Sequence, residues 1–289
     1  MNFLKKLLKA SPTPTVDGAF QPSPLALKLA TSSKTDYDGG AYSHTYAGKN
    51  RRVLMVCTEE RHMTMANGRK FSTGNHPTEM GLPMLHLLSA GFEIDIFTPT
   101  GAPVIIEDWA MPLGDEAVMK LYRDYAGAFT KPGSLDDFVS NEMAQNTTYC
   151  AVFLPGGHGA MLGLPENVSL GKLLRWAHER HLFTLAICHG PAALLAANED
   201  GSFIYDGYKI AAFPDSVDKQ TPMIGYMPGH MPWMFGEKLK ELGIEIVNSK
   251  ADATCCVDRR LVTGASPKAA NKFGRCAAET LLKELRQRR

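Results

Sequence analysis

The chain has 289 residues, enough for one large α/β domain or two modest ones with a sizeable hydrophobic core. Its 31 Lys and Arg residues against 30 Asp and Glu residues give a formal net charge of +1, which excludes a strongly basic nucleic-acid-binding protein or one attracted to an anionic membrane. Six cysteines without a CxxC pair or disulfide-like spacing are typical of reduced thiols, so we expect a cytoplasmic protein.

The first 48 residues are expected to form an N-terminal tail and a Pro-rich extension. Lys5, Lys6 and Lys9 interrupt the apolar residues of the first segment, which therefore lacks the stretch of about 7–15 apolar residues that a signal peptide needs. The following Ser/Thr-rich segment contains Pro12, Pro14, Pro22 and Pro24. We expect this part of the chain to be mobile and residues 49–289 to form the main domain.

From residue 51 onward, short apolar runs alternate with amphipathic helical patterns. The alternation predicts an α/β fold with a doubly wound, mostly parallel sheet. The stretch 99–148 is too long for a simple connection, so we expect it to form an inserted cap subdomain. The expected strands are 51–58, 92–98, the start of 150–160, 183–187, 208–214, 244–249 and a hairpin at 254–264. The expected helices are 77–91, 115–129, 134–145, 168–181, 190–197, 232–242 and a last one from 267.

The stretch FTLAICHGPAALLAA, residues 183–197, places a cysteine between a strand pattern and a helix pattern. FTLAI is a short apolar run typical of a buried strand, and GPAALLAA opens with Gly and Pro like a helix start. Cys188 and His189 would therefore lie on a strand-to-helix bend, as in a nucleophile elbow, at the sheet edge where function gathers. The alternative is a buried cysteine that only fills space.

The glycine-rich turn PGGHG after the strand near residue 150 has three interpretations. GHGAMLG partly matches a dinucleotide-binding fingerprint, but its glycine spacing departs from G-x-G-x-x-G. Alternatively, the backbone N–H groups of Gly156 and Gly157 face the thiol and stabilise an oxyanion, because only glycine allows so close an approach of the backbone. The third interpretation is a tight turn without a chemical role.

Glu79, in the segment GNHPTEM, also has three interpretations. It can be a carboxylate in the first turn of a helix, where the helix dipole favours it. With His76 it could form half of a metal site, but no further ligands have convincing spacing, so we expect no metal. Finally, Glu79 could meet Cys188 at the strand ends, hold the thiolate and transfer protons.

Several motifs together carry a family resemblance: STGNHPTE, FLPGGHGAMLGLPE, AICHGPAALLAA, FPDSVDKQTP, IGYMPGH and RRLVTGASPKAAN. They resemble the DJ-one/PfpI superfamily, and in particular its bacterial HchA branch, from about residue 17 to residue 282. The resemblance implies a flavodoxin-like sheet, similar to that of class I glutamine amidotransferases, with a nucleophile elbow and a smaller cap.

The resemblance also implies roles for four side chains. Cys188 would be the nucleophile and His189 its adjacent histidine. Asp218 would orient that histidine, and Glu79 would be the carboxyl partner of the thiol. The spacing of the residues alone does not distinguish Asp218 from Asp215, so this choice follows from the resemblance.

One departure concerns a metal site. Some members of this branch carry two histidines and a carboxylate between their domains, and the matching positions here are Leu88, Glu93 and Tyr125. An aliphatic side chain, one carboxylate and a phenol make a poor divalent-cation site, so we expect no bound metal and no cofactor.

The activity that the resemblance implies is a glutathione-independent glyoxalase, which converts small α-oxoaldehydes such as methylglyoxal to D-lactate. It also implies a deglycase for proteins and nucleotides glycated by methylglyoxal or glyoxal, with a place in stress response and DNA repair. A homodimer and a holdase chaperone for unfolded client proteins are further expectations. The alternatives are a holdase as the main role, or a cysteine peptidase or aminopeptidase, which would need an open groove.

Overall fold

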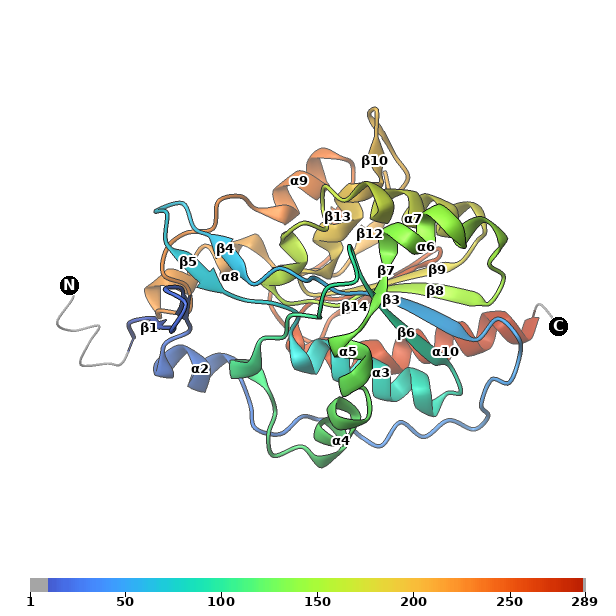
Figure 1. Ribbon diagram of the computed structural model, residues 1–289, viewed down its shortest axis with the longest axis horizontal. Helices are drawn as coiled ribbons and strands as arrows, with labels where there is room; N and C mark the ends of the chain where they lie inside the picture. Colours follow the sequence, from blue (N-terminus) through green and yellow to red (C-terminus); the bar gives the residue numbers. More distant parts are fainter. Residues whose placement is uncertain (1–9, 288–289) are drawn as a thin grey trace.

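The computed structural model describes residues 10–287 and has a seven-stranded central sheet between two helical layers (Figure 1). The strand order is β14-β15-β9-β8-β3-β6-β7, and every neighbouring pair is parallel except β14 with β15. This confirms the doubly wound, mostly parallel sheet. The strands are β3 (Arg52–Val56), β6 (Glu93–Thr98), β7 (Gly133–Ser134), β8 (Tyr149–Leu154), β9 (Phe183–Ile187), β14 (Cys255–Asp258) and β15 (Leu261–Gly264).

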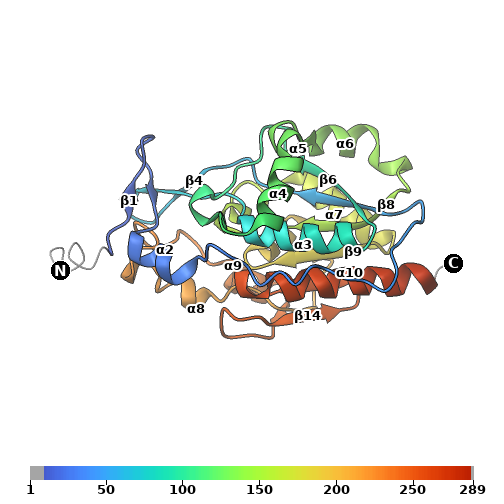
Figure 2. The same cartoon turned by 90° about the horizontal axis from the view of Figure 1, so that it is seen from below.

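Helices cover both faces of this sheet, which is why its central strands are continuous apolar runs. All residues of β8 and β9 are buried. On one face α3 (Pro77–Ser89) and α10 (Ala270–Gln287) lie side by side, with α4 (Glu116–Asp124) and α5 (Ala126–Thr130) beyond α3 (Figure 2). The other face carries α6 (Leu135–Asn141), α7 (Val168–Glu179), the 3-10 helix η4 (Gly190–Ala197) and α9 (Phe235–Glu241).

Two of the expected strands form a separate ribbon. The segments 208–214 and 244–249 contribute only β12 (Lys209–Ile210) and β13 (Glu245–Ile246), which pair with each other in parallel. They do not extend the central sheet, because β14 already occupies the edge beside β15. The expected hairpin at 254–264 is β14 and β15. A further small hairpin consists of β10 (Asn198–Glu199) and β11 (Ser202–Phe203).

The segment 99–148, expected to be a cap, is built into the main domain. Strand β7 pairs with β6 at the edge of the central sheet. Helix α6 packs through buried Leu135 and Phe138 into the same hydrophobic cluster as α7, whereas α4 packs through Val118 and Leu121 against α3. Its remaining elements are the 3-10 helices η1 (Asp108–Ala110) and η2 (Met143–Gln145). The apolar faces of these helices therefore complete the two helical layers.

The segment that covers part of the main domain is the N-terminal one, not 99–148. We expected part of this N-terminal segment to be a mobile tail. Strands β1 (Thr13–Pro14) and β2 (Phe20–Gln21) join β5 (Lys70–Ser72) and β4 (His62–Thr64) in a second sheet, and α2 (Pro24–Ala30) follows. Ser23 caps α2 by accepting a hydrogen bond from the Ala26 N–H at 3.1 Å, and its own hydroxyl donates to the Ile224 carbonyl at 2.9 Å. Residues 10–30 are thereby docked onto the segment around residue 224. The expected tail over residues 1–9 lies outside the described residues.

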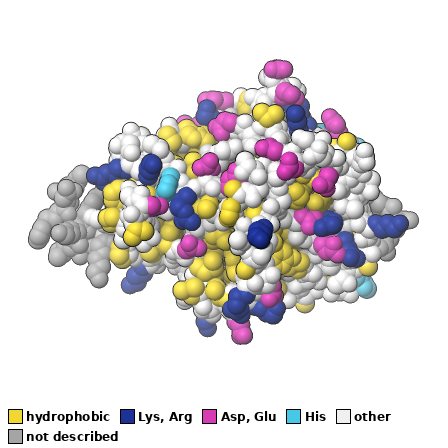
Figure 3. All heavy atoms as spheres, viewed as in Figure 1, with side chains coloured by type: hydrophobic (Ala, Val, Ile, Leu, Met, Phe, Trp, Pro, Cys, Tyr) yellow, Lys and Arg dark blue, Asp and Glu magenta, His cyan; other side chains and the backbone are white. Residues whose placement is uncertain are grey.

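The surface shows charges of both signs. On the face drawn in Figure 3, Lys and Arg side chains are interspersed with Asp and Glu, as the net charge of +1 leads one to expect. Within residues 10–287, no helix has the length and apolar character needed to cross a membrane.

Candidate active site

Cys188 lies at the carboxyl end of β9, on the bend into η4. Its backbone φ is +61°, in the left-handed region that non-glycine residues adopt rarely and at a cost. Two backbone hydrogen bonds hold this conformation: the Cys188 N–H donates to the Gly264 carbonyl at 2.8 Å, and the Phe213 N–H donates to the Cys188 carbonyl at 3.0 Å. The strand, bend and helix start of the expected elbow are therefore present, with the bend fixed from both neighbouring segments.

The thiol is aligned with a histidine and an aspartate. Cys188 Sγ lies 3.3 Å from His189 Nδ1, and His189 Nε2 lies 2.8 Å from an oxygen of Asp218, at the end of α8 (Asp215–Asp218). All three side chains are buried. Asp215, which spacing alone could not distinguish from Asp218, instead accepts a hydrogen bond from the Gly236 N–H at 3.0 Å. The structure thus brings together the three residues that the resemblance selected.

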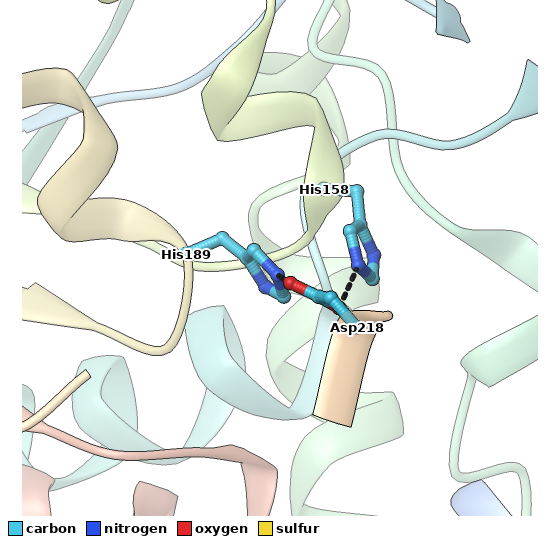
Figure 4. Close-up of side chains that lie close together, drawn as sticks. All are labelled: His158, His189 and Asp218. Atoms are coloured by element: carbon cyan, nitrogen blue, oxygen red, sulfur yellow. Dashed lines mark hydrogen bonds and ion pairs between the residues drawn. The ribbon is translucent and has the colours of Figure 1, made fainter. Parts of the chain in front are cut away.

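Asp218 also binds a second histidine, which sequence reasoning missed. His158 begins the 3-10 helix η3 (His158–Met161), and its Nε2 lies 3.0 Å from the other oxygen of Asp218 (Figure 4). Burial alone would raise the pKa of Asp218, but the two histidines outweigh it and hold this pKa well below its usual range. The sequence offered one indication of His158: it belongs to the glycine-rich turn PGGHG at the carboxyl end of β8, where functional residues of such sheets gather.

Glu79 lies in the first turn of α3, fully buried beside the thiol. A Cβ placed on Gly156 would collide with its carboxyl group and would come within 2.8 Å of the Cys188 Cβ, so the three residues are packed together. Neither carboxyl oxygen has a well-directed hydrogen bond among the described residues. Burial raises the pKa of Glu79 to about 8, although the Cys188 thiol and the Gly157 N–H oppose the shift. At neutral pH this carboxyl group is therefore largely protonated.

The thiol shares this enclosed environment. Burial, followed by the charge of Glu79, raises the pKa of Cys188 above its ordinary value. The two groups interact directly, so they titrate as a pair. The resting site therefore holds a protonated thiol and a largely protonated carboxyl group at neutral pH.

Gly156 and Gly157 of the PGGHG turn lie close to this pair. Gly156 packs behind Cys188 and Glu79, where any side chain would displace them. Gly157 has a φ of +99° and lines the cavity. A hydrogen bond from its N–H to the carboxyl group of Glu79 lowers the pKa of that group. The turn thus places backbone close to the thiol, as the proposed oxyanion role requires.

The thiol opens into a small cavity of about 240 Å³. Its walls include Phe213 and Tyr226, and part of its cover is Leu29 and Ala30 of α2 together with residues around η5 (Thr221–Met223). Among the described residues that line the cavity, Glu107 is the one from the segment 99–148. The sequence analysis did not predict a role for it. Burial raises the pKa of Glu107 to about 7, while the Thr73 hydroxyl donates to one of its oxygens at 2.6 Å.

The positions considered for a metal do not form a site. Glu93 is bound to Arg51 and its side chain is 47% exposed, while Leu88 and Tyr125 offer no matching ligand atoms. Within the described part of the chain, the group with a metal-binding composition is His158, His189 and Asp218. There each histidine Nε2 faces its own oxygen of Asp218 at hydrogen-bond distance, so hydrogen bonding accounts for the arrangement.

Comparisons with known proteins place the chain in a family. No family model matches the chain. Protein/nucleic acid deglycase 1 of Escherichia coli strain K12 is 46% identical over 266 residues, which cover 92% of this chain and 93% of that protein. This chain belongs to the HchA family of protein/nucleic acid deglycases. Its HchA membership confirms the resemblance to that branch of the DJ-one/PfpI superfamily.

Solved structures support the fold of this HchA chain. The Rapid Encystment Protein of 24 kDa from Francisella tularensis has a TM-score of 0.68 at 23% identity, covering 80% of this chain and 99% of that chain. Glyoxalase III from Candida albicans has a TM-score of 0.62 at 22% identity, covering 80% of this chain and 98% of that chain. Both have the same sheet-and-helix arrangement at low identity.

Proposed function

We propose that this protein is a glutathione-independent glyoxalase and a deglycase of glycated proteins and nucleotides, with Cys188 as its nucleophile. The observation that carries the proposal is the packing of Glu79 against Cys188, with His189 Nδ1 3.3 Å from the sulfur, at a cavity of about 240 Å³. A nucleophile, a base for its proton and a carboxyl group for proton transfer are the groups that this chemistry needs. The 46% identity to an Escherichia coli deglycase supports the same activity.

The first step is addition of sulfur to the aldehyde. His189 Nδ1 takes the thiol proton, and the ionised Asp218 stabilises the resulting imidazolium. Sulfur then bonds to the aldehyde carbon, and the protonated Glu79 donates its proton to the carbonyl oxygen to give a hemithioacetal, which leaves Glu79 as the carboxylate that acts in the second step. With a glycated amine, sulfur replaces nitrogen on that carbon, and the amine leaves with a proton. Both substrates thus reach the same intermediate.

The second step moves a hydrogen between adjacent carbons. Glu79 removes the proton from the former aldehyde carbon and returns it to the neighbouring carbon through an enediol, which gives a thioester. Water cleaves this thioester, releasing a hydroxy acid and the thiol. Methylglyoxal thereby yields lactate, and we propose the D isomer.

The size of the cavity weighs against the peptidase alternative. A volume of about 240 Å³ accommodates a small aldehyde or a modified side chain, whereas a peptidase needs an open groove for an extended chain. A holdase role has one supporting observation: Leu29, which lines the cavity, is 65% exposed, and Met223 of η5 is 68% exposed. The proposal includes this holdase role for unfolded client proteins, a homodimer and a cytoplasmic location.

The deciding experiment is incubation of the purified protein with methylglyoxal in the absence of glutathione. We expect stoichiometric formation of lactate, assayed with stereospecific D- and L-lactate dehydrogenases, and release of free amine from methylglyoxal-treated N-acetylarginine. Absence of lactate from a protein with a normal thermal transition would overturn the proposal.

A further inference from the structure

The isomerisation step of the proposed mechanism moves two protons, and Glu79 accounts for one of them. Here O1 is the former aldehyde oxygen and O2 is the oxygen of the neighbouring carbonyl group. When Glu79 takes the proton from the aldehyde carbon, the C–H electron pair forms the C=C bond and the carbonyl π pair moves onto O2. The thioester then requires that O1 lose its proton and that O2 gain one. The cavity therefore needs a group that can donate to O2 and accept from O1.

Three of the described side chains that line the cavity carry a hydroxyl group. Two of them already donate to the backbone: Thr221 Oγ1 to the Asp218 carbonyl at 2.7 Å, and Ser266 Oγ to the Asp252 carbonyl at 2.7 Å. The third is the phenol of Tyr226, whose hydroxyl group has no hydrogen-bond partner among the described residues. Protein atoms do not seal this oxygen off, so it is accessible from the cavity.

Neighbouring rings hold the phenol of Tyr226 in place. Its ring centroid lies 5.8 Å from the centroids of Phe71 and His158 and 5.7 Å from that of Trp109. The Tyr226 N–H donates to the Thr221 carbonyl at 3.0 Å, which ties this backbone to η5. The hydroxyl group is therefore presented to the cavity by a ring that has little freedom to turn away.

The phenol also lies close to the reacting groups. Burial, and after it the charges of Glu107 and Cys188, raise the pKa of Tyr226 well above its ordinary value, with smaller effects from Asp218 and Glu79. Charges act strongly on a buried group only over short distances, so the hydroxyl group lies near the thiol and the carboxyl groups around it. It stays protonated at neutral pH and can donate a hydrogen bond.

The histidines beside the thiol are not suited to this transfer. His158 is neutral and donates through Nε2 to Asp218 (Figure 4), so its Nδ1 carries no hydrogen to give to O2. In the proposed mechanism His189 holds the thiol proton during this step. A backbone N–H, such as that of Gly157, can stabilise an oxyanion but cannot pass on a proton.

We propose that the Tyr226 hydroxyl group is a further catalytic group, which donates to O2 of the substrate and carries the proton from O1 to O2. It gives its proton to O2 as the enediol forms, and it takes the proton of O1 as Glu79 protonates the neighbouring carbon. Glu79 starts and ends this step as a carboxylate, and Tyr226 starts and ends it as a phenol, so atoms and charges balance. The inference rests on the proposed glyoxalase function and deepens it.

Tyr226→Phe tests this role, because it removes the hydroxyl group and keeps the ring. We expect kcat for methylglyoxal to fall by roughly 10²- to 10³-fold, the range for loss of one donor to an oxyanion. With methylglyoxal deuterated at the aldehyde carbon, the isotope effect on kcat should be at least as large as in the native protein, because the carbon–hydrogen step becomes rate-limiting. A smaller isotope effect would place the defect at another step and would contradict the inference.

Tyr125 provides a matched control. It is half-buried between α4 and α5, it is not among the described residues that line the cavity, and its hydroxyl group likewise has no hydrogen-bond partner in the described part of the chain. Tyr125→Phe should therefore have the kcat of the native protein. Equal losses in the two variants would show that the hydroxyl group of Tyr226 has no special role.

A second measurement separates this role from a structural one. Propanal has the aldehyde group of methylglyoxal but lacks O2, so it can form the hemithioacetal with Cys188 and go no further. Its protection of Cys188 against iodoacetamide should be the same in the native protein and in Tyr226→Phe, because forming the hemithioacetal does not use Tyr226. Weaker protection in the variant would reveal a distorted site and would overturn the inference.

These measurements distinguish the inference from the proposed function. If the native protein makes no lactate from methylglyoxal, both fail. If the native protein makes lactate and Tyr226→Phe keeps its full kcat, the inference fails alone. It also fails alone if Glu107→Gln loses turnover and Tyr226→Phe does not, because the second buried carboxyl group would then carry the proton.

Discussion

The imidazole ring of His158 lies against that of His189, with 3.9 Å between the ring centroids, and both rings bind the same carboxylate. Asp218 carries one negative charge, so it can balance one imidazolium. Burial and the neighbouring His189 lower the pKa of His158, which keeps that ring neutral. In the proposed mechanism the charge of Asp218 is therefore available to His189 when that ring accepts the thiol proton, and the hydrogen bond from His158 holds the carboxylate in place.

Replacing Asp218 by Asn should reduce turnover strongly without unfolding the protein. An amide cannot accept hydrogen bonds through both of its heavy atoms, and it carries no charge to stabilise the His189 imidazolium. We expect kcat for methylglyoxal to fall by roughly 10²- to 10⁴-fold, the range for loss of an orienting carboxylate in a triad. Asp215→Asn is the matched control, because Asp215 binds the Gly236 N–H. Equal losses in both variants would show that Asp218 has no special role.

Cys188→Ala should abolish lactate formation. The substitution removes one sulfur atom and keeps the Cβ, so the free energy of unfolding should change by about 1 kcal/mol. Cys57→Ala is the control, since Cys57 is also buried and directly follows β3, which β8 separates from β9. Lactate and urea unfolding should be measured for both. If the holdase activity is independent of the enzyme activity, Cys188→Ala should still suppress the aggregation of a heated client protein. Loss of both activities in this variant would show that the holdase effect is a by-product of deglycation.

Glu79→Gln separates thiol reactivity from proton transfer. The amide keeps a hydrogen-bond donor beside the sulfur but cannot exchange a proton between the two substrate carbons. We expect a thiol that iodoacetamide still alkylates near neutral pH, together with loss of most turnover. The pH dependence of Cys188 alkylation, followed by mass spectrometry, should also shift, because the native groups titrate as a pair. Full turnover in Glu79→Gln would reduce Glu79 to a residue of the helix start.

The buried Glu79 should also affect stability in a pH-dependent way. Its pKa is about 8 in the folded protein, against an ordinary value of 4.5, so the folded state binds this proton more tightly. The contribution of Glu79 to stability is complete below pH 4.5 and is lost as the pH rises towards and through 8. Glu79→Gln has no such proton. Its free energy of unfolding relative to the native protein should therefore increase between pH 5 and pH 8.5 by at most about 1.4 kcal/mol per pH unit. Urea unfolding at both pH values measures this difference, and a constant difference would contradict it.

Chelation should leave the activity unchanged. Leu88 and Tyr125 replace the ligands that a metal would need beside Glu93, and Glu93 is bound to Arg51. After prolonged EDTA treatment we expect the same kcat for methylglyoxal and the same unfolding midpoint. Elemental analysis of the untreated protein should find less than stoichiometric zinc. One zinc per chain, with lower stability after its removal, would show that other residues bind it.

The central sheet and the bend at Cys188 could be predicted because buried parallel strands are continuous apolar runs with local turn signals. The helix α2, which covers part of the cavity, could not be predicted in this position. It docks through hydrogen bonds from Ser23 to residues 224 and 225, and no periodic pattern in the sequence indicates such a contact. His158 was missed for a similar reason. Its partner Asp218 is 60 positions away, and only the folded chain brings the two together.

The distance along the chain between Ser23 and Ile224 has a consequence for biosynthesis. Their hydrogen bond joins residues 201 positions apart, and α2 contributes part of the wall around the thiol. During translation, α2 leaves the ribosome early but cannot dock until the segment around residue 224 has also emerged. Contacts of such long range form late, because closing the intervening loop is entropically costly. The nascent chain therefore exposes Cys188 to the surrounding metabolites before its own N-terminal segment encloses it.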